Sequence, residues 1–442
     1  MKLIHPIQSR RPIRTALVAL LAAAVPAGAL AAPASADARA NPISLVSVGL
    51  NGGGGDGASG LDGRPGVSSG GRFVVFSSYA SDLVAGDTNG QRDVFVRDTA
   101  TGRTTLVSVG VGGVQGNAES RQGSISADGR FVAFNSYASN LLPGDTNDSP
   151  DVFLRDLVTG RTTLVSVGLQ GWADQGAHEP GISTDGRHVA FTSSATNLVA
   201  GDTNDTQDIF VRDLHAGRTE RVSLTAEGLQ SDLPSAQPAI SGNGLVVAFT
   251  AIGGGGEIQV RDRTANTTRV ISDGVPADPR AFVVEPESAA VSADGRFVVF
   301  TVIGWLGVGV DPIANVWLRD LRTNELQLIS ADHLGRPSSA IGAATGDVSA
   351  DGRYVTFGTK GQTSRADQGA LSDVYRLDRK TGALVWITHR QDQTDPYGGR
   401  NGSYSPAISD DGHHVAFDSD DKRLVRGGGT SGYDVYRWSS AG

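Results

Sequence analysis

Cysteine is absent from the 442 residues of this chain. The protein therefore has no disulfide bond, no thiolate ligand for a metal ion and no cysteine nucleophile. Its fold must be stabilised by burial and hydrogen bonding, and enzymes that depend on a cysteine are excluded.

Basic charge is also scarce. The chain has 38 Lys and Arg residues against 47 Asp and Glu residues, which gives a net charge of −9. Residues 1–36 contain four basic residues and no acidic one, so the remainder has 34 against 47, a net charge of −13. Proteins that bind nucleic acid need clustered Lys and Arg to neutralise phosphates. We therefore expect no nucleic-acid partner.

Long apolar runs are missing except near the N-terminus. Residues 15–32 are mostly Ala, Leu and Val, and four basic residues precede them: Lys2, Arg10, Arg11 and Arg14. The run contains Pro26 and is short for a membrane span, and Ala34-Ser35-Ala36 fits a signal-peptidase site. We expect residues 1–36 to be a signal peptide and residues 37–442 to be a secreted chain without a membrane span. The segment 9–13 also resembles a twin-arginine signal, so the Sec and twin-arginine routes both stay open.

The sequence does contain an internal repeat. The pattern S-x-D-G-R-x-V-x-F occurs at 126–134, 183–191, 292–300 and 349–357, and again at 409–417 with His413 in place of the Arg. Looser copies lie at 68–76 and 241–249. Each copy has a glycine at the same place: Gly71, Gly129, Gly186, Gly244, Gly295, Gly352 and Gly412. The mean period is about 57 residues, which is in the range of repeat architectures.

Each repeat has the period-two alternation of β-strands, and no helical periodicity follows residue 36. In the second copy we expect strands at 123–126, 130–135, 151–156 and 162–167. The glycines lie at turns, where a positive φ costs them little. Four antiparallel strands in each of seven repeats predict a seven-bladed β-propeller, an all-β fold occupying residues 37–442 as a single domain.

The two ends of the chain complete this prediction. The seventh copy stops after a third strand at 433–438, whereas residues 43–48 match the fourth strand at 104–109. We expect the N-terminal strand to complete the last blade and close the ring, which removes open sheet edges.

The repeat resembles that of TolB-type β-propellers. The resemblance rests on the S-x-D-G-R-x-V-x-F motif, a following D-V-F-x-R-D strand and a T-G turn, and it covers residues 41–442. It implies a propeller of the kind that makes protein contacts in the cell envelope, in some cases attached to a peptidase. The chain differs from TolB in having seven copies rather than six and a longer loop after the second strand, and we expect no appended domain.

Long polar loops suggest where a ligand would bind. Loops on a rigid scaffold often carry function, and those joining strand four to strand one contain varied polar groups. These are Asn117, Glu119 and Arg121 in one loop, Trp172, Asp174, His178 and Glu179 in the next, and Asp392, Asp395 and Tyr397 in the last. We expect this loop face to bind a protein or a cell-wall glycan.

The loops after strand two repeat a second pattern of oxygen-bearing residues. Alternating Asp and Asn recur in the first three copies, at Asp87 and Asn89, at Asp145 and Asn147, and at Asp202 and Asn204. Because Ca²⁺ takes six to eight oxygen ligands, these residues are candidates for weak calcium sites. Asp and Asn also bond their own backbone in turns, and the acidic residue that follows, such as Asp93, suits a structural role at the start of strand three.

Two classes of function remain open. The first is a monomeric binding or scaffold module without catalytic residues. The second is a hydrolase or lyase whose carboxylates or metal ion converge on the propeller axis. Residues from different blades would form such a site, so their spacing in the sequence does not reveal it. Two carboxylates about 5–9.5 Å apart would favour a glycosidase, whereas an axial pocket lined by small residues would favour binding.

Overall fold

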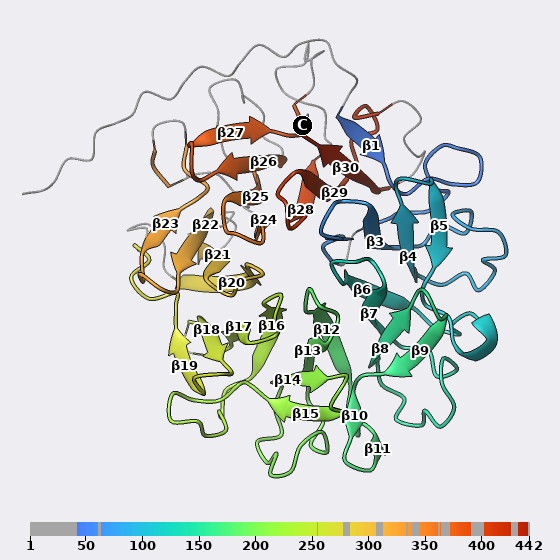
Figure 1. The fold of residues 1–442 in the computed structure, drawn as a ribbon, viewed down its shortest axis with the longest axis horizontal. Coiled ribbons are helices and arrows are strands. Elements are labelled where there is room, and N and C mark those ends of the chain that lie inside the picture. The colour runs from blue at the N-terminus through green and yellow to red at the C-terminus, as the bar shows by residue number, and fades with distance from the viewer. Residues whose placement is uncertain are drawn as a thin grey trace, which may run out of the picture. The chain divides into compact units, whose positions relative to one another are not determined.

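The protein was analysed as a computed structural model. The structure describes residues 42–60, 63–253, 255–276, 283–305, 313–332, 335–337, 344–360, 363, 372–389, 402–425 and 432–440. The proposed signal peptide therefore lies outside the described residues. Seven four-stranded antiparallel sheets surround one axis in the unit formed by residues 36–442 (Figure 1). The predicted seven-bladed, all-β propeller is confirmed.

The blades follow one another along the chain, each as a meander from an inner to an outer strand. Blades 1 to 4 contain, in order, β2 (Gly66–Val67), β3 (Phe73–Ser78), β4 (Asp93–Asp98) and β5 (Arg103–Leu106); β6 (Ser120–Ile125), β7 (Phe131–Ser136), β8 (Asp151–Asp156) and β9 (Arg161–Leu164); β12 (Ala177–Ile182), β13 (His188–Ser193), β14 (Asp208–Asp213) and β15 (Arg218–Arg221); β16 (Ser235–Ile240), β17 (Val246–Ala251), β18 (Glu257–Asp262) and β19 (Thr267–Val270).

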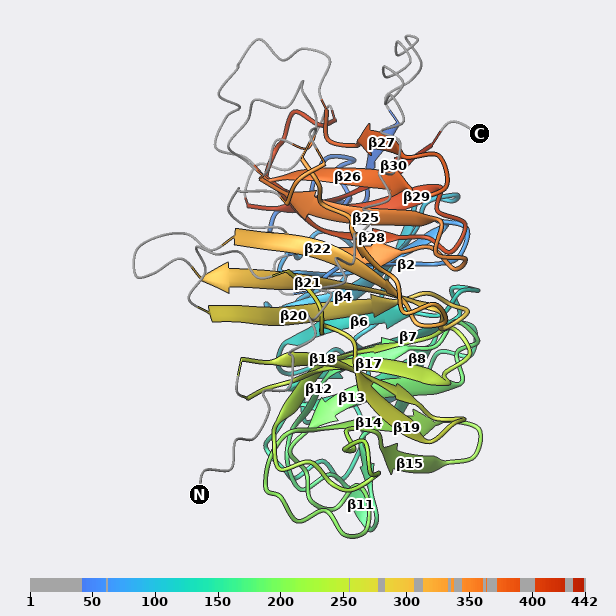
Figure 2. The same cartoon turned by 90° about the vertical axis from the view of Figure 1, so that its left-hand side faces the viewer.

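Blades 5 to 7 continue the same plan. They contain β20 (Val283–Val291), β21 (Phe297–Trp305), β22 (Ile313–Asp320) and β23 (Leu326–Leu328); β24 (Ala344–Val348), β25 (Tyr354–Thr359), β26 (Asp373–Asp378) and β27 (Ala383–Trp386); β28 (Ser403–Ile408), β29 (His414–Ser419), β30 (Asp434–Ser439) and β1 (Ile43–Leu45). Figure 2 shows that β20, β21 and β22 extend beyond the strands of the adjoining blades.

Helical structure in the described residues is limited to one 3-10 turn, Val111–Gly113. A small hairpin of β10 (Val167–Gly168) and β11 (Gly171–Trp172) forms a separate two-stranded sheet between β9 and β12 in the chain. No helix in the described part of the chain is long and apolar enough to cross a bilayer. The inner strand of blade 2 begins at Ser120, earlier than the expected 123, because a bulge interrupts its pairing between Arg121 and Ser124.

The ring closes through the N-terminal strand, as predicted. β1 pairs with β30, with Ile43 opposite Trp438. Beyond β1, Ser47 Oγ donates to Asp434 Oδ1 at 2.9 Å, and Val435 N donates to Ser47 Oγ at 3.1 Å. The same bonds link strands three and four within blade 2, where Ser166 donates to Asp151 at 2.6 Å. The N-terminus therefore supplies the missing fourth strand of blade 7 together with its serine.

A ring of backbone hydrogen bonds joins the blades at their first turns. Each turn donates an N–H to the carbonyl of the next turn, at N···O distances from 3.0 to 3.4 Å. The pairs are Ser69 to Ala127, Ala127 to Thr184, Asp185 to Gly242, Gly242 to Ala293, Asp294 to Ala350, Ala350 to Asp410 and Asp411 to Ser69. The last pair links blade 7 to blade 1, so this belt runs around the whole propeller.

The turn glycines have a second role beside their backbone conformation. All seven have φ between +69° and +73°, and a Cβ on any of them would lie 2.0–2.9 Å from the side chain that begins strand two of the preceding blade. The pairs are Gly71 with His414, Gly129 with Phe73, Gly186 with Phe131, Gly244 with His188, Gly295 with Val246, Gly352 with Phe297 and Gly412 with Tyr354. These glycines are therefore required both for the turn and for packing between blades.

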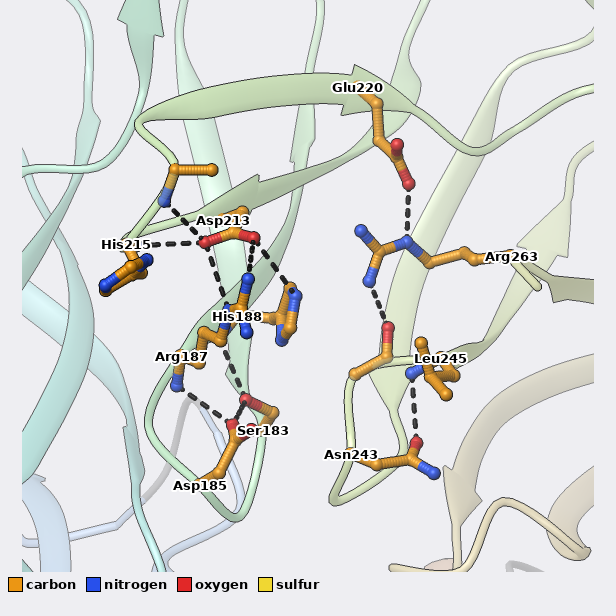
Figure 3. Close-up of polar contacts among 12 residues, drawn as sticks. Ser183, Asp185, Arg187, His188, Asp213, His215, Glu220, Asn243, Leu245 and Arg263 are labelled. Carbon is orange, nitrogen blue, oxygen red and sulfur yellow. Dashed lines mark hydrogen bonds and ion pairs between the residues drawn. The ribbon is translucent and has the colours of Figure 1, made fainter.

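Figure 3 shows the polar contacts around His188 and Arg263, where blade 3 meets blade 4. Arg187 Nη2 donates to Asp213 Oδ2 at 2.9 Å, and the ring of His188 lies with its Nε2 3.7 Å from the same oxygen. Across the gap Arg263 Nε donates to Glu220 at 2.5 Å and its Nη1 donates to the carbonyl of Gly244. His188 is 7% exposed, and its Nδ1 is buried without a hydrogen-bond partner.

We expect His188 to make folding sensitive to acid. Its burial lowers the pKa of the imidazole, so below an unfolded pKa of about 6.5 the unfolded chain takes up a proton that the folded chain does not. The stability supplied by the neutral ring is complete above pH 6.5 and decreases as the pH falls towards the folded pKa, by at most about 1.4 kcal/mol per pH unit.

His188→Phe tests this, because Phe73 and Phe131 occupy the same position in blades 1 and 2. The free energy of unfolding in urea should be measured for both proteins at pH 7.5 and at pH 5. The value for the variant minus that for the wild type should be larger at pH 5. Other titrating groups are common to both proteins and cancel in the comparison. An equal difference at both pH values would show that His188 does not cause the effect.

Candidate functional site

The inner strands surround an axial pocket of about 510 Å³. Small-molecule sites in proteins span about 300–1,000 Å³, so the pocket is large enough for a ligand. Its wall combines small residues such as Gly66 and Ala239 with aliphatic side chains. The aliphatic residues are those directly before the repeat serine: Val67, Ile125, Ile182, Ile240, Val291, Val348 and Ile408. No aromatic side chain belongs to the described lining.

A group of polar side chains lies towards the loop end of the inner strands, four residues before the repeat serine. Gln122, Glu179, Gln237 and Ser405 occupy this position in blades 2, 3, 4 and 7, and all line the pocket. We call these four residues the mouth group. Arg64 has the same position in blade 1.

Backbone bulges place the mouth group. Its residues have φ of 57°, 56°, 56° and 50°, a region that non-glycine residues rarely adopt. Each lies where the pairing of strands one and two shifts register, for example between His178 and Gly181. Bulges redirect side chains near functional sites, and strained residues that persist need support from the surrounding structure. The same register shift recurs in blades 2 to 7, which indicates a feature of the fold.

Hydrogen bonds connect the mouth group from blade to blade. Gln122 Oε1 accepts from the backbone N–H of Glu179 at 3.1 Å, and Glu179 Oε2 accepts from that of Gln237 at 2.8 Å. Strand two supports these side chains from behind, since Thr192 donates to Glu179 at 2.8 Å and Thr250 donates to Gln237 at 3.2 Å. The side chains are thus held in place at the mouth of the pocket.

The opposite wall of the pocket carries charge. Arg64 Nη1 from blade 1 donates to the carbonyl of Gly346 in blade 6 at 3.1 Å and lies 3.6 Å from Asp347 Oδ1. Asp347 Oδ2 accepts from the N–H of Ile408 at 2.9 Å. Burial raises the pKa of Asp410 near the turn end, and nearby Asp347 adds to that effect. The pocket can therefore offer both donors and acceptors.

The expected calcium loops form turns. Asn147 Oδ1 accepts from the N–H of Ser149 at 3.0 Å, and its Nδ2 donates to Asp151 and to the carbonyl of Ala173, both at 3.0 Å. Asn89 and Asn204 make the matching bonds. Asp87 and Asp202 accept from Gln115 and Gln230, and burial raises the pKa of all three loop aspartates, Asp145 included.

The aspartate that follows each loop is the first residue of strand three, and its side chain is buried. Asp151 is fully buried and accepts from Ser166 at 2.6 Å, and burial raises its pKa to about 6. Asp93 is equivalent, and its pKa is also raised to about 6. These carboxyls tie the loop to strand four.

Calcium binding by these loops stays a prediction. No three His, Asp or Glu side chains in the described part of the chain group as a metal site. If the loops bind calcium, backbone carbonyls and water must supply most ligands, and we expect millimolar to sub-millimolar affinity. Calorimetry on the chelator-treated protein should then give a heat that Asp145→Ala with Asn147→Ala reduces. No heat at millimolar calcium would leave the loops as turns.

The loop face differs in detail from the sequence-based expectation. Arg121, His178 and Glu179 belong to inner strands β6 and β12 rather than to loops, and only Glu179 lines the pocket. Arg121 Nη2 donates to the rim residue Tyr137 at 2.7 Å. Asp392, Asp395 and Tyr397 lie outside the described residues. Sequence reasoning missed Gln122, Gln237 and Ser405, although their constant distance from the repeat serine was a usable signal.

Comparisons with known proteins support the fold. No family model matches the chain, and no curated protein matches its sequence. An oligogalacturonate lyase solved in complex with manganese has a TM-score of 0.53 at 13% identity, over 90% of this chain and 97% of the other. The propeller domain of the trilobed protease from Pyrococcus furiosus, described as having an open velcro topology, has a TM-score of 0.52 at 11% identity, over 87% and 94%.

TolB is also among the similar structures. The putative TolB from Agrobacterium tumefaciens has a TM-score of 0.39 at 16% identity, over 60% of this chain and 79% of the other. At these identities the matches concern the fold alone. With its repeated turn motif, its four-stranded antiparallel blades and its closing N-terminal strand, the chain is a seven-bladed β-propeller.

Proposed function

We propose that this chain is a secreted, monomeric binding module that holds a short extended segment of a partner protein in its axial pocket. The observation that carries the proposal is the mouth group, four polar side chains turned to the pocket by the same bulge in four blades. Sites that select ligands combine an apolar wall with a few placed polar groups, and this pocket has both.

The lining favours a peptide over a glycan. Sugar rings pack their flat C–H faces on aromatic side chains, and the described lining has none. The Val and Ile residues of the wall suit an aliphatic side chain. The amides of Gln122 and Gln237 suit the N–H and C=O groups of a peptide backbone. A cell-wall glycan is the alternative ligand, and it is compared with a peptide by the saccharide probes described below.

A hydrolase or lyase with axial carboxylates is the second class of function. The described lining has three carboxylates, from Glu179, Asp347 and Asp410. Asp347 is held by Arg64 and the N–H of Ile408, and Glu179 by Thr192 and the N–H of Gln237. These bonds give the two groups positioning roles, so we place binding first. If the purified protein cleaved a bound peptide or glycan, the catalytic function would become the better proposal.

A variant that fills the pocket tests the proposal. Ala239 lines the pocket from β16, and Ala239→Leu should reduce binding of peptides from a bead-displayed tetrapeptide library at least tenfold. Ala265→Leu is the matched control, because Ala265 lies exposed in an outer turn. Both variants should keep the wild-type melting temperature within a few degrees. Equal binding by Ala239→Leu and the wild type would exclude the axial pocket as the site.

A further inference from the structure

One buried side chain behind the mouth group lacks hydrogen-bond partners. Asn135 in β7 is 0% exposed, and neither its Nδ2 nor its Oδ1 is bonded. Burying an unsatisfied polar group is costly, and nearly all buried side-chain amides in proteins have partners. An asparagine kept in this state requires an explanation.

The repeat shows what this position does in other blades. Its equivalents in blades 3 and 4 are Thr192 and Thr250, whose hydroxyls donate to the mouth residues Glu179 and Gln237. In blade 2 the equivalent mouth residue is Gln122. Arg121, the residue directly before Gln122, is the strand partner of Asn135. By this equivalence Asn135 lies behind Gln122, and it is not itself part of the described lining of the pocket.

Gln122 does not use Asn135. Its Oε1 accepts from the N–H of Glu179 in the next blade instead. The Nε of Arg121 is also buried without a partner. Two donors, Asn135 Nδ2 and Arg121 Nε, and one acceptor, Asn135 Oδ1, therefore lie without partners near Gln122.

We propose that Asn135 binds a backbone amide of the peptide segment held in the axial pocket. A carboxamide offers a donor and an acceptor side by side, which complements the N–H and C=O of one residue in an extended chain, because these two groups point to the same side of the strand. Binding requires Gln122 to give up its hydrogen bond with the N–H of Glu179. Asn135 Nδ2 then donates to the C=O of one peptide residue, and Oδ1 accepts from the N–H of the same residue. The binding energy gained at Asn135 offsets the cost of leaving it unsatisfied in the free protein. This inference rests on the proposed function.

Asn135→Thr separates stability from binding. Threonine occurs at this position in blades 3 and 4, so the variant should fold, and its hydroxyl should donate to Gln122. We expect the melting temperature to rise by about 1–3 °C, because an unsatisfied group is removed. The affinity for acetyl-tetra-alanine amide, measured by titration calorimetry or NMR, should fall at least tenfold. Asn135→Ser is the second variant, since Ser77 stands at this position in blade 1.

Three probes identify the group that Asn135 recognises. Acetyl-tetra-alanine amide should bind better than either saccharide. Chitotetraose carries its amides on sugar rings, and cellotetraose has no amide. Preferential, Asn135-dependent binding of chitotetraose would overturn the peptide assignment. Equal binding of cellotetraose would overturn amide recognition.

The variants also distinguish the two proposals. Peptide binding that survives Asn135→Thr but not Ala239→Leu would overturn the role of Asn135 and leave the pocket as the site. Binding that survives both would overturn both proposals, as would no binding of any probe at millimolar concentration. A melting temperature that falls in both Asn135 variants would contradict the premise that this side chain is unsatisfied.

Discussion

Gly129→Ala should destabilise the protein by about 2–5 kcal/mol, more than any other single methyl group added at a turn of blade 2. Gly129 has φ +73°, and its Cβ would lie 2.1 Å from Cδ2 of Phe73 in blade 1. A positive φ costs an L-residue about 1–2 kcal/mol, and overpacking adds about 1–3 kcal/mol. The measurement is the free energy of unfolding in urea, provided that the transition is two-state.

Gly112→Ala is the control for the backbone part of this effect. Gly112 has a φ of +72° but no atom within 4 Å of a Cβ built on it. It should therefore show the strain alone, about 1–2 kcal/mol. Equal losses in the two variants would contradict the packing of each turn glycine on the preceding blade. The related pair Gly129→Val and Ala127→Val should differ in the same direction.

Removing the closing strand should have an even larger effect. A chain that begins at residue 49 lacks β1, and with it the buried side chains of Ile43 and Val46 and the bond from Ser47 to Asp434. Each aliphatic side chain contributes about 1.5–3 kcal/mol and the hydrogen bonds about 1 kcal/mol each. The sum approaches the whole stability of a typical domain. We expect little soluble protein, with an exposed edge on β30.

A chain that begins at residue 42 keeps β1 and is the matched control. It should express and melt like the chain that begins at residue 37. If the chain beginning at residue 49 had the same melting temperature, closure by β1 would contribute nothing to stability, and the blade assignment at the ends of the chain would be in doubt.

The repeat predicted the architecture well because it records contacts that recur in every blade. The S-x-D-G turn specifies both the positive φ of Gly129 and the space for Phe73, and the match of residues 43–48 to residues 104–109 predicted the ring closure. Asp93 and Asp151 were expected at the start of strand three, where they are buried against serine hydroxyls.

The candidate site was harder to predict because it depends on departures from the repeat. Gln122, Glu179 and Gln237 reach the pocket only through bulges, and period-two alternation does not reveal a positive φ. Asn135 occupies a strand position that holds Ser77 in blade 1, threonine in blades 3 to 5, Gly358 in blade 6 and Asp418 in blade 7. Its missing partners are visible only once β6 and β7 are placed beside blade 3.

The most direct test of the binding site is methyl NMR on the protein labelled at isoleucine. Ile125, Ile182 and Ile240 line the axial pocket, whereas Ile271, Ile329 and Ile387 are buried directly after the fourth strands of blades 4, 5 and 6. Adding acetyl-tetra-alanine amide should shift the first three methyl resonances, with saturation, and leave the other three unchanged. Shifts limited to Ile271, Ile329 and Ile387 would place the ligand on the outer edge of the blades and contradict binding in the axial pocket.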